Sequence, residues 1–153
     1  MGDAEWLTWI DDNLQLRVHL HEIVRSIFSG GDDLASFCHL ERESTYDEAQ
    51  IVQFLELDNG ELVDRQMERY RSERLPRRFG LLEAAIVVRR NTARVRQMNQ
   101  LWWQEISHDS HQDQLIARYA LWTSNLTYCT LPGSRGRSRM CRSYPHRTAR
   151  RAG

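Results

Sequence analysis

Short apolar runs alternate with apolar positions at helical spacing along this chain. The runs, typical of buried strands, are Trp6–Ile10, Leu34–Cys38 and Leu81–Val88, and Ile86-Val87-Val88 is the strongest strand signal. The helical spacing predicts helices over Arg17–Phe28, from Tyr46 to Leu55 or Leu57, over Glu61–Ser72, after Asn91-Thr92 and after Gln112. Strands and helices in alternation favour an α/β architecture.

The predicted helix over Glu61–Ser72 carries its charges at helical spacing. Arg65, Glu68 and Arg69 fall on one side of it, which we interpret as the solvated side.

The first apolar run stops at Asp11-Asp12-Asn13. Side chains of an extended segment alternate, so Asp11 and Asn13 point to the same side and Asp12 points away. Carboxylate and amide oxygens suit a hard divalent cation such as Mg²⁺ or Mn²⁺, usually together with substrate phosphates. The alternative is a plain turn, because Asp and Asn are turn formers.

The zero net charge of the 153 residues hides a split, and every basic residue is Arg. Residues 134–153 hold seven Arg and no acid, whereas the preceding part holds 14 Arg against 21 acids. The Arg-rich tail, residues 131–153, is expected to be disordered because it has few apolar residues to pack. Contact with nucleic acid or a membrane surface is the alternative for it, and we expect no specific nucleic-acid partner.

The cysteines and the hydropathy of the chain indicate where in the cell the protein is expected. Three widely spaced cysteines match no zinc or disulfide pattern, so reduced thiols are expected. No apolar stretch approaches the roughly 20 residues of a membrane span, and the N-terminus does not read as a signal peptide. We therefore expect a cytoplasmic protein.

Seven short motifs follow in order, and together they resemble a known family. They are Trp9-Ile10-Asp11-x-Asn13-x-Gln15-Leu16, Phe37-x-His39-x-Glu41-Arg42, Tyr46-Asp47-Glu48-Ala49, Gly80-Leu81-Leu82-Glu83, Val87-Val88-Arg89-Arg90-Asn91, Trp102-Trp103-x-Glu105 and Asp113-Gln114-Leu115. The chain resembles the glycosyltransferase-like domain shared by the plant turgor-regulation-defect and mucilage-related proteins and by bacterial proteins.

This resemblance implies a partial nucleotide-sugar transferase (GT-A-like) fold, a mixed sheet flanked by helices, over residues 1–130. It implies transfer of a sugar from a nucleotide-sugar donor to a hydroxyl of a glycan or another acceptor. Asp11 and Asn13 would fill the family's D-x-D-like motif and hold Mn²⁺ or Mg²⁺. Such an ion neutralises the charge that develops on the leaving diphosphate.

Two departures from the family pattern bear on activity. The family has a substantial N-terminal half before the Trp-Ile-Asp strand, and this chain starts a few residues before it. We therefore expect a short or split form, completed by an N-terminal polypeptide. The family also has Arg before its Asp-Gln pair, where this chain has Gln112, which cannot supply that charge.

Acids at the starts of helices are the candidate catalytic residues. Asp113 would face the donor sugar or act near its anomeric carbon, and Asp47 and Glu48 would bind the acceptor or serve as a base. For all three the alternative is a role at the helix N-terminus, where the dipole favours acids.

The candidate substrate-binding residues are His39, Glu83, Gln114 and Trp103. His39 could contact sugar hydroxyls or a metal, or be a structural histidine. Glu83 could contact an acceptor hydroxyl or be a solvated loop acid. Trp103 could stack on a sugar face, while Trp102, at helical spacing with Met98 and Ile106, is expected in the core.

A metal-dependent glycosyltransferase-like protein is therefore the leading hypothesis. A non-catalytic fragment or interaction module of a split glycosyltransferase is the alternative. Metal-dependent hydrolysis ranks last, because the sequence has no Ser-His-Asp or zinc-ligand motif.

Overall fold

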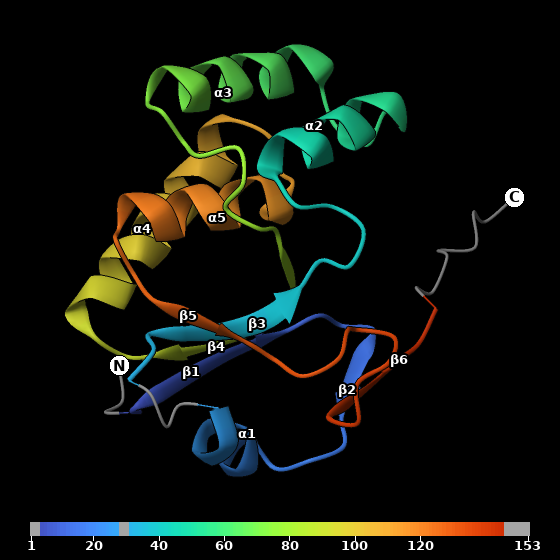
Figure 1. The fold of residues 1–153 in the computed structure, drawn as a ribbon, viewed down its shortest axis with the longest axis vertical. Coiled ribbons are helices and arrows are strands. Elements are labelled where there is room, and N and C mark those ends of the chain that lie inside the picture. Colours follow the sequence, from blue (N-terminus) through green and yellow to red (C-terminus); the bar gives the residue numbers. More distant parts are fainter. Residues whose placement is uncertain (1–3, 28–30, 146–153) are drawn as a thin grey trace, which may run out of the picture.

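A computed structural model describes residues 4–27 and 31–145 of the chain as an α/β fold (Figure 1). The main sheet has four strands in the order β1 (Trp6–Ile10), β4 (Leu82–Arg90), β3 (Leu34–Cys38) and β5 (Tyr128–Thr130). A separate ribbon pairs β2 (Leu14–Leu16) with β6 (Cys141–Ser143). The sheet is mixed, because β3 pairs with β5 in parallel and with β4 antiparallel. The predicted mixed sheet flanked by helices is thus confirmed.

Strand β4 lies between two antiparallel neighbours. Ile10, the last residue of β1, pairs with Ile86, and Cys38, the last residue of β3, pairs with Leu82. The ends of β1 and β3 therefore both lie beside residues 82–86 of β4, at one edge of the sheet. This edge carries the candidate site.

The β3–β4 register shifts between Ser36 and Phe37, whose partners are Val87 and Glu83. The Ser36 hydroxyl lies 2.9 Å from the Ile86 carbonyl oxygen and 3.1 Å from that of Glu83, so it can donate to either. A buried carbonyl without a donor costs free energy, so this serine stabilises the irregularity. The shift brings Glu83 to the sheet edge.

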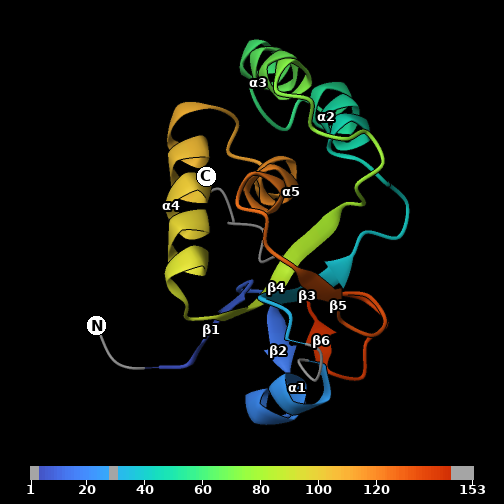
Figure 2. The ribbon, with the colours of Figure 1, turned by 60° about the vertical axis from the view of Figure 1, so that its left-hand side comes forward.

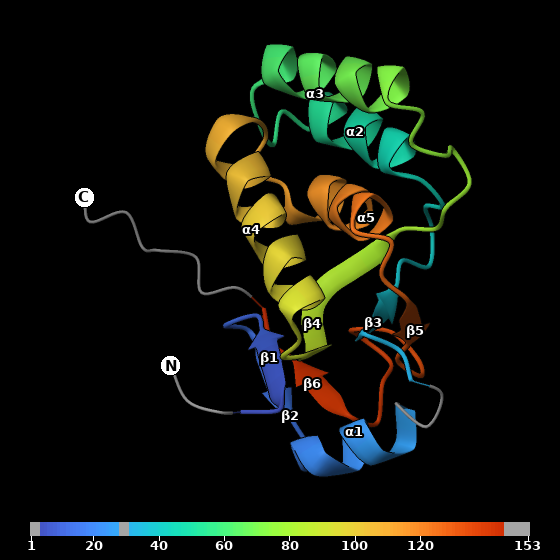
Figure 3. The ribbon, with the colours of Figure 1, turned by 90° about the vertical axis from the view of Figure 1, so that its left-hand side faces the viewer.

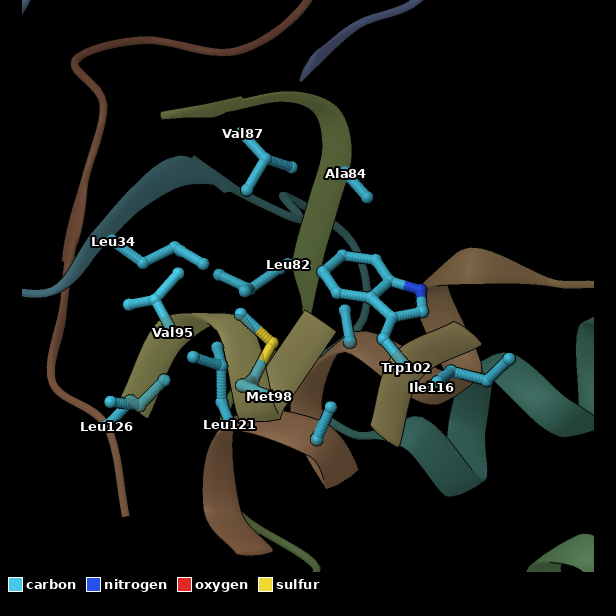
Figure 4. Close-up of a cluster of buried hydrophobic side chains, with 12 residues drawn as sticks. Leu34, Leu82, Ala84, Val87, Val95, Met98, Trp102, Ile116, Leu121 and Leu126 are labelled. Carbon is cyan, nitrogen blue, oxygen red and sulfur yellow. The ribbon is translucent and has the colours of Figure 1, made fainter. Parts of the chain in front are cut away.

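Helices cover both faces of the sheet (Figures 2 and 3). Helices α4 (Ala93–His108) and α5 (Asp113–Thr123) pack on one face, and α1 (Leu20–Ile27) lies on the other with the β2–β6 ribbon. Figure 4 shows the first core, between α4, α5 and strands β3 and β4, with Trp102 beside Ala84. Trp102 is buried there, as predicted.

Helices α2 (Thr45–Phe54) and α3 (Gly60–Ser72) form an outer layer on α5. Side chains cap three helices: Ser44 accepts from the Asp47 amide, Asn59 from the Glu61 and Leu62 amides, and Thr92 from the Val95 amide. The predicted cap at Asn91-Thr92 is therefore confirmed at Thr92. The predicted first helix begins three residues later than expected, at Leu20, and Phe28 is outside the described residues.

A buried polar network fastens α3 to α4. Arg69 Nη2 donates at 2.6 Å both to Glu105 Oε2 and to Asp109 Oδ2, and Tyr70 OH donates to Glu105 Oε2 at 2.7 Å. The Tyr70 and Tyr119 rings stack with centroids 4.1 Å apart. Arg65 and Glu68 are exposed as predicted, but Arg69 is only partly solvated, with 33% of its side chain exposed, because helical spacing identifies a face but not the neighbour that covers it.

The C-terminal segment, residues 131–145, has defined structure. Leu131, Met140 and Cys141 are buried against α1 and the sheet, and β6 pairs with β2. The expected disorder is therefore wrong for these residues, because scattered apolar side chains find a core that local composition does not reveal. Residues 146–153 lie outside the described part.

Glu105→Gln should lower the free energy of unfolding by about 1–3 kcal/mol, because Arg69 and Tyr70 lose their charged acceptor inside the protein. Urea denaturation measures this change. Glu68→Gln, on the exposed side of α3, is the matched control and should stay within about 0.5 kcal/mol. Equal effects of the two substitutions would contradict the role of the network.

Candidate functional site

Four polar residues gather where β1, β3 and β4 meet. Asp11 follows β1, His39 follows β3, and Glu83 is the second residue of β4. Backbone bonds hold the two strand ends: the Asp11 amide donates to Ala85 O at 3.0 Å and the His39 amide to Leu81 O at 2.8 Å. Asn13 follows in the turn between β1 and β2. Polar groups at this edge of an open α/β sheet are well placed to meet a ligand.

Arg135, from the C-terminal segment, joins three of these residues. Its Nη1 lies 3.3 Å from Asp11 Oδ2, and its Nη2 donates to Asn13 Oδ1 at 2.5 Å. Its backbone amide donates to Glu83 Oε2 at 3.3 Å. Asp11 and Asn13 therefore face the same group, and that group is a guanidinium. Residues 12 and 13 form a turn, which was the alternative to an extended segment, so the turn and not strand alternation brings the two side chains together.

Local bonds fix the turn that carries Arg135. Gly133 has φ +86°, a left-handed conformation that glycine adopts without strain, and Ser138 Oγ donates to Pro132 O at 3.1 Å. Further along, Asn13 Nδ2 donates to Tyr144 O at 3.0 Å, and the Tyr144 amide donates to Asn13 O at 2.8 Å. The Asn13 amide nitrogen is thus committed to the C-terminal segment, which turns its oxygen toward Arg135.

The metal predicted for Asp11 and Asn13 does not fit this arrangement. In the described ranges, no group of three or more His, Cys, Asp and Glu side chains is placed to hold a metal ion. A divalent ion about 4 Å from the guanidinium would be repelled by about 8 kcal/mol at an effective dielectric constant of about 20. A metal at this pair and Arg135 in its present position therefore exclude each other.

A cavity of about 250 Å³ opens beside this edge, between β1, β4 and α4. Trp9 connects the cavity to the polar edge, because it lines the cavity and its Nε1 donates to Asp11 Oδ1 at 3.3 Å. Indole and aliphatic groups form most of the wall; its residues are Trp9, Ala84, Val87, Arg89, Asn99, Trp102, Trp103, Ile106 and Asp113. Exposed fractions of 54% for Trp9 and 69% for Trp103 leave their rings available to a ligand.

A few polar groups complete the wall of the cavity. Arg89 Nη1 donates to Asn99 Oδ1 at 2.5 Å, and the Asp113 carboxylate is a third polar group in the wall. Aromatic walls with a few fixed polar groups are typical of small-molecule sites, although this cavity is slightly below their usual range of about 300–1,000 Å³. Such walls suit sugars, which present apolar faces and hydroxyl edges.

Asp113 is the first residue of α5, and its Oδ1 accepts from Trp102 Nε1 at 3.1 Å. Burial raises the pKa of this carboxyl, the Trp102 hydrogen bond opposes the rise, and the negative charge of Asp11 adds to it. A carboxylate with a raised pKa is a stronger base than an ordinary aspartate. Asp113 could therefore accept a proton from a hydroxyl bound in the cavity.

A second, polar cleft of about 230 Å³ is lined by His39, Leu40, Glu41, Glu83 and Ser134. His39 is engaged within its own loop: Nδ1 accepts from the Glu41 and Arg42 amides at 3.2 and 3.1 Å, and Nε2 lies 2.8 Å from Arg42 Nη2. The structure thus brings the predicted residues His39 and Glu83 to one cleft. The contacts of His39 favour a structural histidine.

Of the remaining predicted residues, Glu48 reaches the cluster indirectly. It is buried and forms an ion pair with Arg42, whose guanidinium also contacts His39. Asp47 is exposed in the first turn of α2. Gln114 is half-buried next to Asp113. Catalytic roles for Asp47 and Glu48 and a binding role for Gln114 stay predictions.

Sequence reasoning missed Arg135 and Trp9 as site residues. Arg135 falls in the tail expected to be disordered, although Pro132-Gly133 and Gly136 around it mark a turn. Trp9 was interpreted only as an apolar anchor of its strand. Its partner Val87 faces α4, so Trp9 lies at the rim of the cavity.

The protein is therefore an α/β protein that has a polar cluster at one edge of its sheet and an aromatic cavity next to that cluster. The model of the TOD1/MUCI70 glycosyltransferase-like domain matches residues 1–130, so the chain belongs to this family. No curated protein and no solved structure matches the chain. Arg135 lies beyond the matched residues. No helix in the described part is long and apolar enough to cross a membrane.

Gly133→Ala should destabilise the protein by about 1–2 kcal/mol, because L-residues pay this in the left-handed region. A Cβ would also lie 3.0 Å from Arg137 O and 3.2 Å from Ser138 Cα. Gly136→Ala is the control on the same loop, since its Cβ would meet nothing within 4 Å. Thermal unfolding of both variants checks this; equal midpoints would contradict the assigned turn.

Asp113→Asn should stabilise the protein relative to wild type as the pH rises. The raised pKa means that the folded state resists ionisation, so wild-type stability falls above the ordinary value of 3.8 until the raised pKa is passed. The substitution removes this pH-dependent loss of stability. Urea denaturation of both proteins from about pH 3 to about pH 8 measures the difference in the free energy of unfolding. Asp47→Asn, in the exposed first turn of α2, removes the same charge and is the matched control; a gain of equal size in it would contradict the assignment to Asp113.

Proposed function

We propose that this protein transfers a sugar from a nucleotide-sugar donor to a hydroxyl group of a glycan or another acceptor. Membership of a glycosyltransferase-like family supports this class of reaction. The observation that carries it is the aromatic cavity, with Asp113 and Trp103 in its wall and the Asp11–Asn13 edge next to it. A cytoplasmic location remains part of this proposal.

In the proposed reaction the acceptor sugar lies in the cavity against Trp9 and Trp103. Its hydroxyl oxygen attacks the anomeric carbon of the donor, and the bond from that carbon to the diphosphate oxygen breaks. The hydroxyl proton passes to the Asp113 carboxylate, and the electron pair leaves with the nucleoside diphosphate. Asp113 suits this step because burial makes it a stronger base and Trp102 fixes its orientation.

Mn²⁺ or Mg²⁺ stays a prediction for this reaction. Asp11 and Asn13 could hold the ion only if Arg135 turned away from both of them. We therefore assign the metal no step in the proposed transfer.

A second candidate is one half of a two-part glycosyltransferase. Strand β1 is an outer strand of the main sheet, with β4 on one side only. It contains no charged residue that would discourage pairing with another strand, and its Trp6, Leu7 and Ile10 are half-buried. A further polypeptide could add a strand there. A chain that binds donor alone while sedimenting as a monomer would contradict this candidate.

Asp113→Asn should lower release of nucleoside diphosphate from a responsive nucleotide sugar at least about 100-fold, because a positioned general base contributes that much. The assay screens nucleotide sugars with simple glycosides as acceptors. In the wild type the rate should rise with pH through the raised pKa of Asp113, since only the carboxylate accepts a proton.

Trp103→Ala and Glu68→Gln complete this test. Trp103→Ala should raise KM for the acceptor up to about tenfold with a smaller change in kcat, because stacking contributes to binding. Glu68→Gln should match wild type. Full activity of Asp113→Asn would overturn the assignment of the base.

A further inference from the structure

We propose that Arg135 is the cation that binds the donor diphosphate, so that this chain binds a nucleoside diphosphate without a divalent metal. The proposal starts from the exclusion described above. Asp11 and Asn13, the pair expected to hold a metal, both face the Arg135 guanidinium. The expectation that the ligand carries a nucleoside rests on the proposed function. The expectation that Arg135 binds a diphosphate does not.

The guanidinium is oriented before any ligand arrives. Asn13 holds Nη2 through its oxygen, because its amide nitrogen donates to the Tyr144 carbonyl. Asp11 contacts Nη1 through Oδ2, and its Oδ1 accepts from Trp9. A guanidinium has five N–H donors in a planar fork, and these contacts engage one donor on each terminal nitrogen. Phosphate oxygens are the bidentate partner that this fork matches.

Arg135 is not needed as the anchor of its segment. Burial of Leu131, Met140 and Cys141 and the pairing of β6 with β2 already attach residues 131–145 to the sheet. The Arg135 side chain remains 26% exposed beside Asp11. Its guanidinium is therefore open to solvent next to Asp11, whose other oxygen contacts Trp9 in the wall of the aromatic cavity.

Charge on the segment also favours an anionic ligand. Arg137 and Arg139 are exposed on the same loop, and no acid occurs from residue 134 onward. A positive loop over a sheet edge raises the local concentration of phosphate-bearing ligands. Asp11 offsets part of this charge, so we expect diphosphate oxygens to displace its carboxylate from Nη1 on binding.

Calorimetry of the full chain with inorganic pyrophosphate and with UDP, GDP, ADP and CDP, each with EDTA or with Mn²⁺, tests the proposal. Pyrophosphate and at least one nucleotide should bind in EDTA. Arg135→Gln should weaken both at least about tenfold, because a charge-assisted hydrogen bond is lost. Arg137→Gln, two residues away and exposed, removes the same charge and should bind within about twofold of wild type.

Binding that requires Mn²⁺ and is unchanged or tighter in Arg135→Gln would overturn the inference while leaving sugar transfer intact. In that case Arg135 competes with the metal, and its removal frees Asp11 and Asn13. Pyrophosphate binding through Arg135 with no nucleotide binding would sustain the anion site and count against the proposed function. A folded chain that binds neither probe would overturn both, and circular dichroism and thermal unfolding verify folding of each variant.

Discussion

Antiparallel pairing of β4 with both β1 and β3 is the constraint on which the rest of this structure depends. It brings two strand ends and one strand start to a single edge, so Asp11, His39 and Glu83 become neighbours although they are far apart in sequence. With one parallel pairing in place of either, a strand end would lie at the opposite side of the sheet. The buried cores hold β4 in place and leave this edge open.

Opposite charges meet at that edge and set its chemistry. Asp11 lies close enough to raise the pKa of Asp113, and its own Oδ2 contacts the Arg135 guanidinium. One carboxylate thus interacts with both the proposed base for the proton and the proposed cation for the phosphate. Asp11 therefore acts on both through charge, besides any contact of its own with a ligand.

Local patterns predicted strands β1, β3 and β4 and the helices, because these follow from periodicity along the chain. They did not predict what distant segments supply. Arg69 meets Glu105 on another helix, Glu83 reaches the edge through a register shift at Ser36, and Arg135 arrives from a segment with no periodic pattern. Fold class and family were therefore readable from sequence, whereas the partner of Asp11 was not.

Pairing of β2 with β6 joins residues 14–16 to residues 141–143, near opposite ends of the chain. Contacts of such high sequence separation form late in folding, because the intervening loop must close first. During synthesis the N-terminal strand emerges long before its partner exists. Asp11 and Asn13 thus acquire Arg135 only after the 122-residue separation between Asn13 and Arg135 has been synthesised, so the carboxylate and the guanidinium of this edge cannot meet early in translation.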